Sequence, residues 1–353
     1  MRIHDKLYKI GNSFSQVLSN ADGASINKHQ LSTIRTFDWF QGVGLYGFYK
    51  LYKLTGEKRY YNILKNYYEE QISIGLPPIN INSTAPMLAL CFLNEELKKP
   101  EYDEIILDWA KDLYENVPRA HGGAFQHVTC EALNDNQLWD DTLMMSVLFL
   151  AKVGILYKKN EYVEDAIYQF LEHAKYLLDA KSGLWYHGAN VVEHHNYGQV
   201  FWGRGNAWVT IFIPEFLEIL GDYYVMPSTK RYIISILNML VESLVKYQDE
   251  SGLWHTVIDD LSSYLESSAT AGFSYGILKS IRKGYISKDY EPYGLKGLEA
   301  IIDNINQDGI LMNVSGGTRM GMNKEFYKSI PKREEPYGQA MAMLCLIEGL
   351  LHR

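Results

Sequence analysis

The sequence predicts an all-α protein whose helices form an (α/α)6 barrel, a closed ring of six inner helices surrounded by six outer helices. The first observation is that two kinds of helical segment alternate along the chain. Residues 161–179 place Val163, Ile167 and Phe170 on one stripe with charged residues opposite, a pattern typical of a surface helix. Residues 142–157 (TLMMSVLFLAKVGILY) are apolar on nearly every side, so we expect this helix to be buried among other helices.

The alternation predicts six pairs of helices, each with an outer helix followed by an inner one. Pro214 is expected to kink the fourth inner helix, because proline lacks the amide hydrogen that the turn requires. The outer helices are predicted near 2–19, 57–74, 101–116, 161–180, 228–248 and 291–304. The inner helices are predicted near 37–54, 84–96, 137–157, 203–220, 266–284 and 337–352.

A weak internal repeat is the second observation. The segments GGAFQHV (122–128), SGLWYHG (182–188) and SGLWHTV (251–257) each follow an outer helix and precede an inner one. Small residues followed by an aromatic residue indicate a turn that leads into a short strand. We therefore expect short β-hairpins at one end of the barrel, the end where aromatic and histidine side chains gather to form the functional site.

Composition and charge exclude several classes of function. The net charge is −8 and no long basic block occurs, which argues against a nucleic-acid partner. No stretch approaches the ~20 apolar residues that cross a bilayer, and the N-terminal segment lacks the apolar run of a signal peptide, so we expect no membrane partner. The 3 cysteines have no zinc-like spacing, which favours a reducing compartment and a cytoplasmic location. No Pro-rich or Ser-rich linker divides residues 1–353, so one domain is expected.

The first candidate for chemistry is a pair of acids at the start of the third inner helix. Inner helices begin at one mouth of such a barrel, and there Trp139 is followed by Asp140 and Asp141. The simpler interpretation is that these acids cap the helix and interact with its dipole. An unbroken apolar run follows the pair, however, so one acid should face the interior of the ring. Burial beside tryptophan would raise the pKa of that carboxyl, as a general acid requires.

The second candidate is Arg204, in the segment FWGRGNAW at the start of the fourth inner helix. The simpler interpretation is an ion pair with a neighbouring helix. Flanking glycines let the backbone approach a ligand closely, while Trp202 and Trp208 offer flat faces on which a sugar can stack. A guanidinium is also well suited to bind a carboxylate through two hydrogen bonds. His127 and His187 are more often structural when taken singly, but their recurrence beside aromatic residues favours substrate contact.

Other kinds of site find no support in the sequence. His194 and His195 are adjacent and face different ways, and no three-ligand spacing occurs, so we expect no metal. No phosphate-binding or dinucleotide-binding glycine motif and no nucleophile elbow are present, so we expect no cofactor. Carboxylates, one arginine, tryptophan, tyrosine and histidine remain, and this set of residues favours a site for a small acidic oligosaccharide.

Two motifs give the sequence a family resemblance. With WDDTLMM (139–145) followed by WGRGNAWV (202–209), the chain resembles glycoside hydrolase family 105, the unsaturated rhamnogalacturonyl hydrolases. It is more distantly similar to family 88, the unsaturated glucuronyl hydrolases. The resemblance implies an (α/α)6 barrel that removes the terminal 4,5-unsaturated galacturonyl residue from pectin-derived rhamnogalacturonan oligosaccharides. It also implies the chemistry, in which an Asp protonates C4, water adds to C5 and the resulting hemiketal opens.

The resemblance assigns roles to individual residues. Asp141 matches the Asp of the WxD motif and would be the general acid/base, with Trp139 lining the subsite. His187 would contact the sugar near the reacting carbons. Arg204 and Trp208 would clamp the carboxylate and stack on the ring. Further substrate contacts are expected in the matching segments PRAHGGAFQH, NSTAPMLAL and GVGLYGFYKLY, from His127, Asn82 and Tyr46 respectively.

One departure from the family leaves a role open. Some members carry a second important Asp near the start of the second inner helix, where this chain has Asn80 and Asn82. Asparagine can orient water but cannot take a proton at neutral pH. Either this subgroup uses a single carboxyl, or the second role falls to another residue.

Two alternatives to this function stay open. The first is another (α/α)6 enzyme, either a sugar epimerase or an inverting glycosidase that pairs Asp141 with Glu266 or Glu335. The second is a sugar-binding protein without catalytic activity. The identity of the leaving sugar is expected to depend on loops, including residues 305–335 with Arg319, Lys332 and Arg333.

Overall fold

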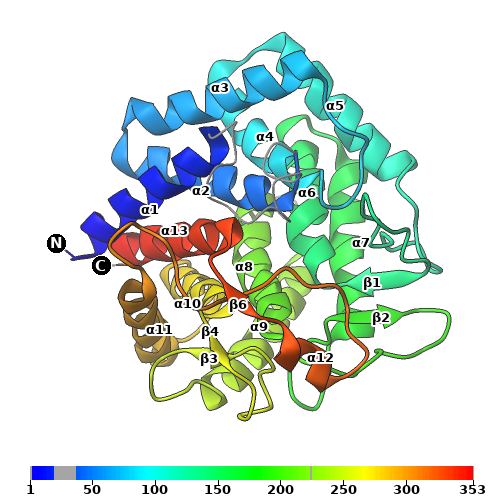
Figure 1. Cartoon of the computed structure of the whole chain (residues 1–353). Coiled ribbons are helices and arrows are strands. Elements are labelled where there is room, and N and C mark those ends of the chain that lie inside the picture. Colours follow the sequence, from blue (N-terminus) through cyan, green and yellow to red (C-terminus); the bar gives the residue numbers. More distant parts are fainter. Residues whose placement is uncertain (1, 20–36, 223–224, 353) are drawn as a thin grey trace.

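A computed structural model describes residues 2–19, 37–222 and 225–352. The long helices alternate between two layers (Figure 1), so the predicted (α/α)6 barrel is confirmed. The outer helices are α1 (Arg2–Ser19), α3 (Lys58–Ile74), α5 (Pro100–Glu115), α7 (Asn160–Leu177), α9 (Pro227–Lys246) and α11 (Glu291–Asn304). The inner helices are α2 (Trp39–Thr55), α4 (Ala85–Leu97), α6 (Leu148–Leu156), α8 (Gly203–Leu220), α10 (Ser267–Arg282) and α13 (Pro336–Leu351).

The inner helices close into a ring. Each packs on the next in chain order, and α13 packs back on α2. The outer helices cover this ring from outside, as α7 covers α6 and α11 covers α10 and α13 (Figure 1). Close packing of α2 depends on its glycines, because a Cβ at Gly42 would lie 2.5 Å from the backbone of Ala85 and one at Gly44 would lie 2.0 Å from the ring of Phe14.

The third inner helix differs from its predicted range of 137–157. Residues Gln137–Trp139 form strand β1, and the helix begins only later, with a π-helical segment η1 (Leu143–Val147) that leads into α6. The amide of Leu148 donates to the carbonyl of Leu143, five residues earlier, which widens this turn. Such widened turns recur at functional sites because they change the direction of side chains at a helix start. The fourth inner helix, α8, continues through Pro214 without a break.

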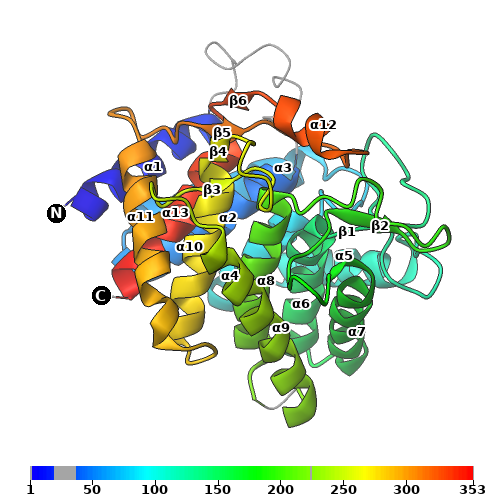
Figure 2. The same cartoon turned by 90° about the horizontal axis from the view of Figure 1, so that it is seen from below.

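Short strands and one extra helix gather at one end of the barrel (Figure 2). Three antiparallel pairs form there: β1 with β2 (Gly188–Asn190), β3 (Trp254–His255) with β4 (Leu265–Glu266), and β5 (Val314–Ser315) with β6 (Lys332–Arg333). The prediction of β structure at this end is confirmed, although the inner helix α6 and the outer helix α7 both lie between β1 and β2 in the sequence. The extra helix α12 (Lys324–Ser329) lies between β5 and β6 in the sequence, and η2 (Lys288–Tyr290) is a 3-10 turn before α11.

The repeated turns lie where the sequence places them, and the structure adds one more. Gly123, Gly183 and Gly252 all have positive φ, and each precedes a short extended segment. Gly309, with φ 78°, makes the same turn after α11, in the segment QDGILMN (307–313), which has Ile and Leu in place of the aromatic residue. Within the described ranges, no helix is both long enough and apolar enough to span a membrane.

Candidate active site

The pairing of β1 with β2 places the two acids beside a histidine. Trp139 lies opposite Gly188 in this pair, and the amide of Asp140 donates to the carbonyl of His187 at 3.0 Å. Asp141 follows directly, just before η1. Residues 46 positions apart in the sequence (187 − 141) are thereby brought together at the mouth of the inner ring.

A cavity of about 570 Å³ opens at this end of the barrel. This volume lies within the range of small-molecule sites, about 300–1,000 Å³. The side chain of Asp141 lines the cavity and is 18% exposed, so it is reachable from the cavity but largely shielded from solvent. Four residues expected to bind substrate also line it: Trp139, His127, Asn82 and Arg204.

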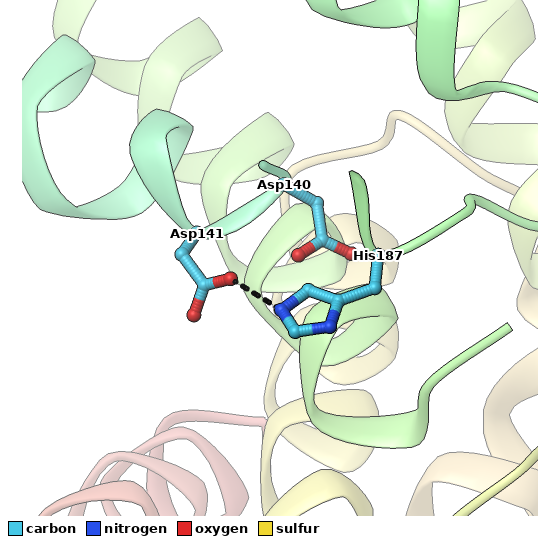
Figure 3. A group of neighbouring side chains, drawn as sticks. All are labelled: Asp140, Asp141 and His187. Atoms are coloured by element: carbon cyan, nitrogen blue, oxygen red, sulfur yellow. Dashed lines mark ion pairs between the residues drawn. The ribbon is translucent and has the colours of Figure 1, made fainter. Parts of the chain in front are cut away.

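Asp141 forms an ion pair with His187 (Figure 3), with 3.2 Å between Oδ2 and Nε2. Burial alone would raise the pKa of Asp141, but the hydrogen bond and charge of His187, with a contribution from His127, outweigh it and lower the pKa to about 2. In the free site the pKa of Asp141 is therefore lowered, not raised as a general acid requires. His187 is itself 2% exposed and contacts Asp141 rather than lining the cavity.

Asp140 has the buried environment that the sequence predicts for one acid of the pair. Its side chain is fully buried, and neither carboxyl oxygen has a hydrogen-bond partner within the described ranges. A Cβ at Gly205 would lie 2.2 Å from Asp140 Oδ2, so only glycine fits at this place in WGRGN. Burial, and then the negative charge of Asp141, raise the pKa of Asp140 well above its usual value. The environments of the two acids thus shift their pKa values in opposite directions, upward for Asp140 and downward for Asp141.

This assignment predicts a pH effect on stability. The pKa of Asp140 is higher in the folded protein than its unfolded value of ~3.9, so its contribution to stability is greatest below pH ~3.9 and decreases as pH rises. Asp140→Asn cannot ionise and should remove this decrease. We expect the difference in melting temperature, variant minus wild type, to be more positive at neutral pH than near pH 4. The same difference at both pH values, measured by calorimetry, would show that Asp140 is ionised in the fold.

Arg204 is a buried cation in the same cavity wall. It is 1% exposed, and its guanidinium lies 4.5 Å from the ring centre of Trp202 and 4.7 Å from that of Tyr337. Nη1 donates to the carbonyl of Ser315 at 2.7 Å and Nη2 to that of Gly316 at 3.0 Å, while Nε has no partner among the described residues. No carboxylate of the described residues forms a salt bridge with it. A buried cation without a counter-ion favours an anionic ligand.

Aromatic side chains form another part of the cavity wall. Trp139 stacks on His127 with 4.2 Å between ring centres and 9° between ring planes. Burial lowers the pKa of His127 to about 4, so this histidine is neutral near pH 7, and its Nδ1 lies 2.8 Å from Thr142 Oγ1. A neutral imidazole and an indole present the flat, weakly polar surface on which a sugar ring packs.

Besides His187, two more of the expected substrate contacts do not line the cavity. Trp208 is fully buried and packs edge-on behind Trp39, with 6.0 Å between ring centres, so it supports the wall without lining it. Tyr46 also lies outside the lining of this cavity. Its hydroxyl donates to Glu215 Oε2 at 2.6 Å, in a second cavity formed by other residues. Tyr46 stands seven residues into α2, about 10 Å along the helix from its start, which takes it away from the mouth.

The two asparagines near α4 divide their roles. Asn80 Oδ1 accepts hydrogen bonds from the amides of Asn82 and Ser83, so it shapes the turn before the helix, whereas Asn82 faces the cavity.

A second carboxyl in the cavity wall comes instead from Asp38, just before α2. Burial raises the pKa of Asp38 to about 6, against the lowering effect of its hydrogen bond to the Trp39 amide. Sequence reasoning missed Asp38 because a lone acid at a helix start is indistinguishable from a cap.

The two glutamates that would pair with Asp141 in an inverting glycosidase do not line the cavity. Glu266 is fully buried and caps α10, accepting from the amides of Ser268 at 2.7 Å and Ala269 at 2.6 Å. Glu335 is 1% exposed and precedes α13.

The segment from β5 to β6 (residues 314–333), here called the strap, crosses the same end of the barrel (Figure 2). Its part 317–322 contributes to the cavity wall, and Arg319 there pairs with Glu131 at 2.5 Å. Lys332 and Arg333 are exposed on β6 and do not line the cavity. Other cavity residues that sequence reasoning missed lie in loops without periodic pattern, namely Thr129, Cys130, Asn134 and Tyr197, or at the start of β1, where Gln137 lies.

Within the described ranges, one group of side chains brings enough donor atoms together to be compared with a metal site. One donor atom from each of Asp140, Asp141 and His187 lies within 4.8 Å of the others. His187 Nε2 faces Asp141 directly (Figure 3), rather than a point shared by all three groups. Asp140 is the member whose pKa is raised. The geometry of these three residues therefore fits proton transfer.

Comparisons with known proteins agree with the geometry. A model of the family described as Glycosyl Hydrolase Family 88 matches residues 16–351. The Unsaturated rhamnogalacturonyl hydrolase YesR of Bacillus subtilis (strain 168) is 35% identical over 317 residues, covering 89% of this chain and 90% of that protein. The crystal structure of a possible GH105 family member from Salmonella enterica serovar Paratyphi A is 41% identical, with a TM-score of 0.92 over 99% of this chain and 94% of that chain. Unsaturated glucuronyl hydrolase from Bacillus sp. GL1, at 16% identity, a TM-score of 0.73 and coverage of 98% and 95%, shares the fold.

Proposed function

The chain belongs to glycosyl hydrolase family 88, together with GH105 relatives, and is a glycosidase; we propose that it removes the terminal 4,5-unsaturated galacturonyl residue from pectin-derived rhamnogalacturonan oligosaccharides. The observation that carries the proposal is the position of Arg204. This buried cation, without a carboxylate partner among the described residues, lines the same cavity as Asp141. A small acidic sugar supplies the missing negative charge.

The proposed reaction is hydration of the double bond between C4 and C5. Protonated Asp141 gives its proton to C4, and positive charge develops at C5 beside the ring oxygen. Water adds to C5 and returns a proton to Asp141. The hemiketal opens to a ketone at C5, the former ring oxygen stays on C1, and collapse at C1 releases the rest of the sugar chain. Asp141 thus acts first as acid and then as base.

Substrate binding has to protonate Asp141, because the free site holds this group ionised. The carboxylate of the sugar brings a second negative charge, and the sugar displaces water from the cavity; both effects raise the pKa of Asp141. Asp140 keeps the proton of the pair nearby, since its donor atom lies within 4.8 Å of those of Asp141 and His187. We propose this pair as the source of the proton.

The remaining side chains hold the sugar. Arg204 Nε points to no protein acceptor within the described ranges and is proposed to bind the uronate. The stacked pair of Trp139 and His127 offers a platform for the ring, and Asn82 offers an amide for a hydroxyl. We also propose that the chain forms one catalytic domain, since α13 closes the ring on α2, and that it works in the cytoplasm, in keeping with its odd number of cysteines.

A pair of substrates tests the proposal. An unsaturated disaccharide and its saturated counterpart are incubated separately with the protein, and loss of the ultraviolet absorbance of the double bond and release of the reducing-end sugar are followed. We expect turnover of the unsaturated sugar alone. Cleavage of the saturated sugar alone would instead indicate an ordinary glycosidase, and binding of both without turnover would indicate a sugar-binding protein.

A further inference from the structure

His187 lies between Asp141 and a residue of the strap. Its Nε2 faces Asp141, while its Nδ1 lies 2.6 Å from the hydroxyl oxygen of Tyr327, on α12. Tyr327 is 1% exposed. A residue from α12 thus reaches the proposed acid/base through one histidine, although 140 positions separate Tyr327 from His187.

The direction of these hydrogen bonds follows from a third contact. The amide of Gly321 donates to the Tyr327 oxygen at 2.9 Å, which occupies one of its acceptor positions. Burial raises the pKa of Tyr327, so the phenol keeps its proton. That proton has His187 Nδ1 as its acceptor, because a buried hydroxyl without an acceptor is unfavourable. With Nδ1 accepting, the imidazole carries its proton on Nε2, the atom that faces Asp141 Oδ2 at 3.2 Å.

From this geometry we propose that Tyr327 is a positioning residue that fixes His187 in its Nε2–H tautomer and thereby orients the Asp141 carboxylate for proton transfer. The inference rests on the proposed role of Asp141. In the opposite tautomer, Nε2 would present a lone pair to the carboxylate, and the two acceptors would repel each other. A proton on Asp141 would then be donated to Nε2 instead of to the substrate.

The strap holds Tyr327 firmly enough for such a role. Asn323 caps α12 by accepting from the amide of Phe326, and Lys324 pairs with Asp259 at 2.8 Å. At the other end of the strap, Arg204 binds the carbonyls of Ser315 and Gly316. The ring of Tyr327 packs in a small buried cluster with Val200, Trp202, Val257 and Ile330.

Tyr327→Phe tests the inference because it removes the hydroxyl and keeps the ring. We expect kcat on the unsaturated disaccharide to fall about 10- to 100-fold, as when a partner that orients a functional histidine is removed, with KM changed less than about twofold. The matched control is Tyr68→Phe. Tyr68 lies on the outer helix α3, and its buried hydroxyl donates to the carbonyl of Pro86 at 2.6 Å. The control should keep wild-type kcat. Wild-type kcat for Tyr327→Phe would overturn the inference.

A second measurement does not depend on activity. Nitrogen-15 NMR of labelled histidine reports the tautomer, and the signal of His187 is identified by its loss in His187→Gln. We expect Nε2–H in the wild-type protein and a mixture of tautomers in Tyr327→Phe. A wild-type His187 with its proton on Nδ1 overturns the inference even if the variant fails to fold. Failure of the proposed function is distinguished from this result, because it would appear as absence of turnover by the wild-type protein.

Discussion

Asp141→Asn is expected to lower kcat on an unsaturated rhamnogalacturonan disaccharide by about 10² to 10⁴-fold, the contribution of a positioned general acid/base. Asparagine keeps the shape of the side chain and its place beside His187, but it cannot give a proton to C4 or take one from water. Substrate affinity should change much less, because the stacked rings and Arg204 remain.

Asp108→Asn is the control for the loss of one negative charge in Asp141→Asn. Asp108 is exposed on α5, outside the cavity, and this variant should keep full activity. Initial rates followed by the absorbance of the double bond give kcat and KM for both variants. The assignment of Asp141 fails if its asparagine variant retains more than about one tenth of the wild-type kcat.

Glu215→Gln is expected to have the largest effect on stability. Glu215 is 1% exposed and pairs with Lys279 at 2.5 Å and with Lys50 at 3.0 Å, while the hydroxyls of Tyr46 and Tyr275 also donate to it. Burial alone would raise the pKa of Glu215, but the two lysines outweigh it and lower the pKa well below its usual value. Removing its charge leaves two ammonium groups without their shared partner, which should cost about 3–5 kcal/mol in the free energy of unfolding.

Glu218→Gln is the matched control for that loss. Glu218 also pairs with Lys279, at 2.5 Å, but its side chain is 39% exposed, so its loss should cost less than about 1 kcal/mol. Urea unfolding followed by circular dichroism compares the two variants at neutral pH. If both variants lower the free energy of unfolding by the same amount, the buried network around Glu215 stabilises the protein no more than the partly exposed pair of Glu218 with Lys279. Activity measured well below the unfolding transition should change little in either variant.

The ring of helices could be predicted from the sequence because each helix carries its own signal. The stripe of Val163, Ile167 and Phe170 marks an outer helix, and the apolar run after Thr142 marks an inner one. The start of the third inner helix could not be predicted, since its first residues pair with β2, and that pairing depends on a segment about 50 positions away. The first inner helix, predicted from residue 37, begins at Trp39 in the structure, directly after its cap Asp38. Residues 20–36 and 223–224 lie outside the described part of the chain.

The candidate site was predictable where a motif carries it. Asp141 and Arg204 belong to two motifs at the starts of inner helices, and both line the cavity. The protonation of the acid pair was not predictable, because it depends on how His187 contacts Asp141 and how Gly205 covers Asp140. Tyr327 was missed for the same reason. The strap has no periodic pattern, and the partner of the tyrosine lies 140 positions away.

The central claim is that Asp141 protonates C4 of an unsaturated uronide, and it is tested most directly by running the reaction in heavy water and examining the first product by NMR. The account predicts one deuterium at C4, on one face only, together with loss of the double bond, and neither change at a comparable rate with Asp141→Asn. Release of the reducing-end sugar with the double bond of the uronide intact would contradict it.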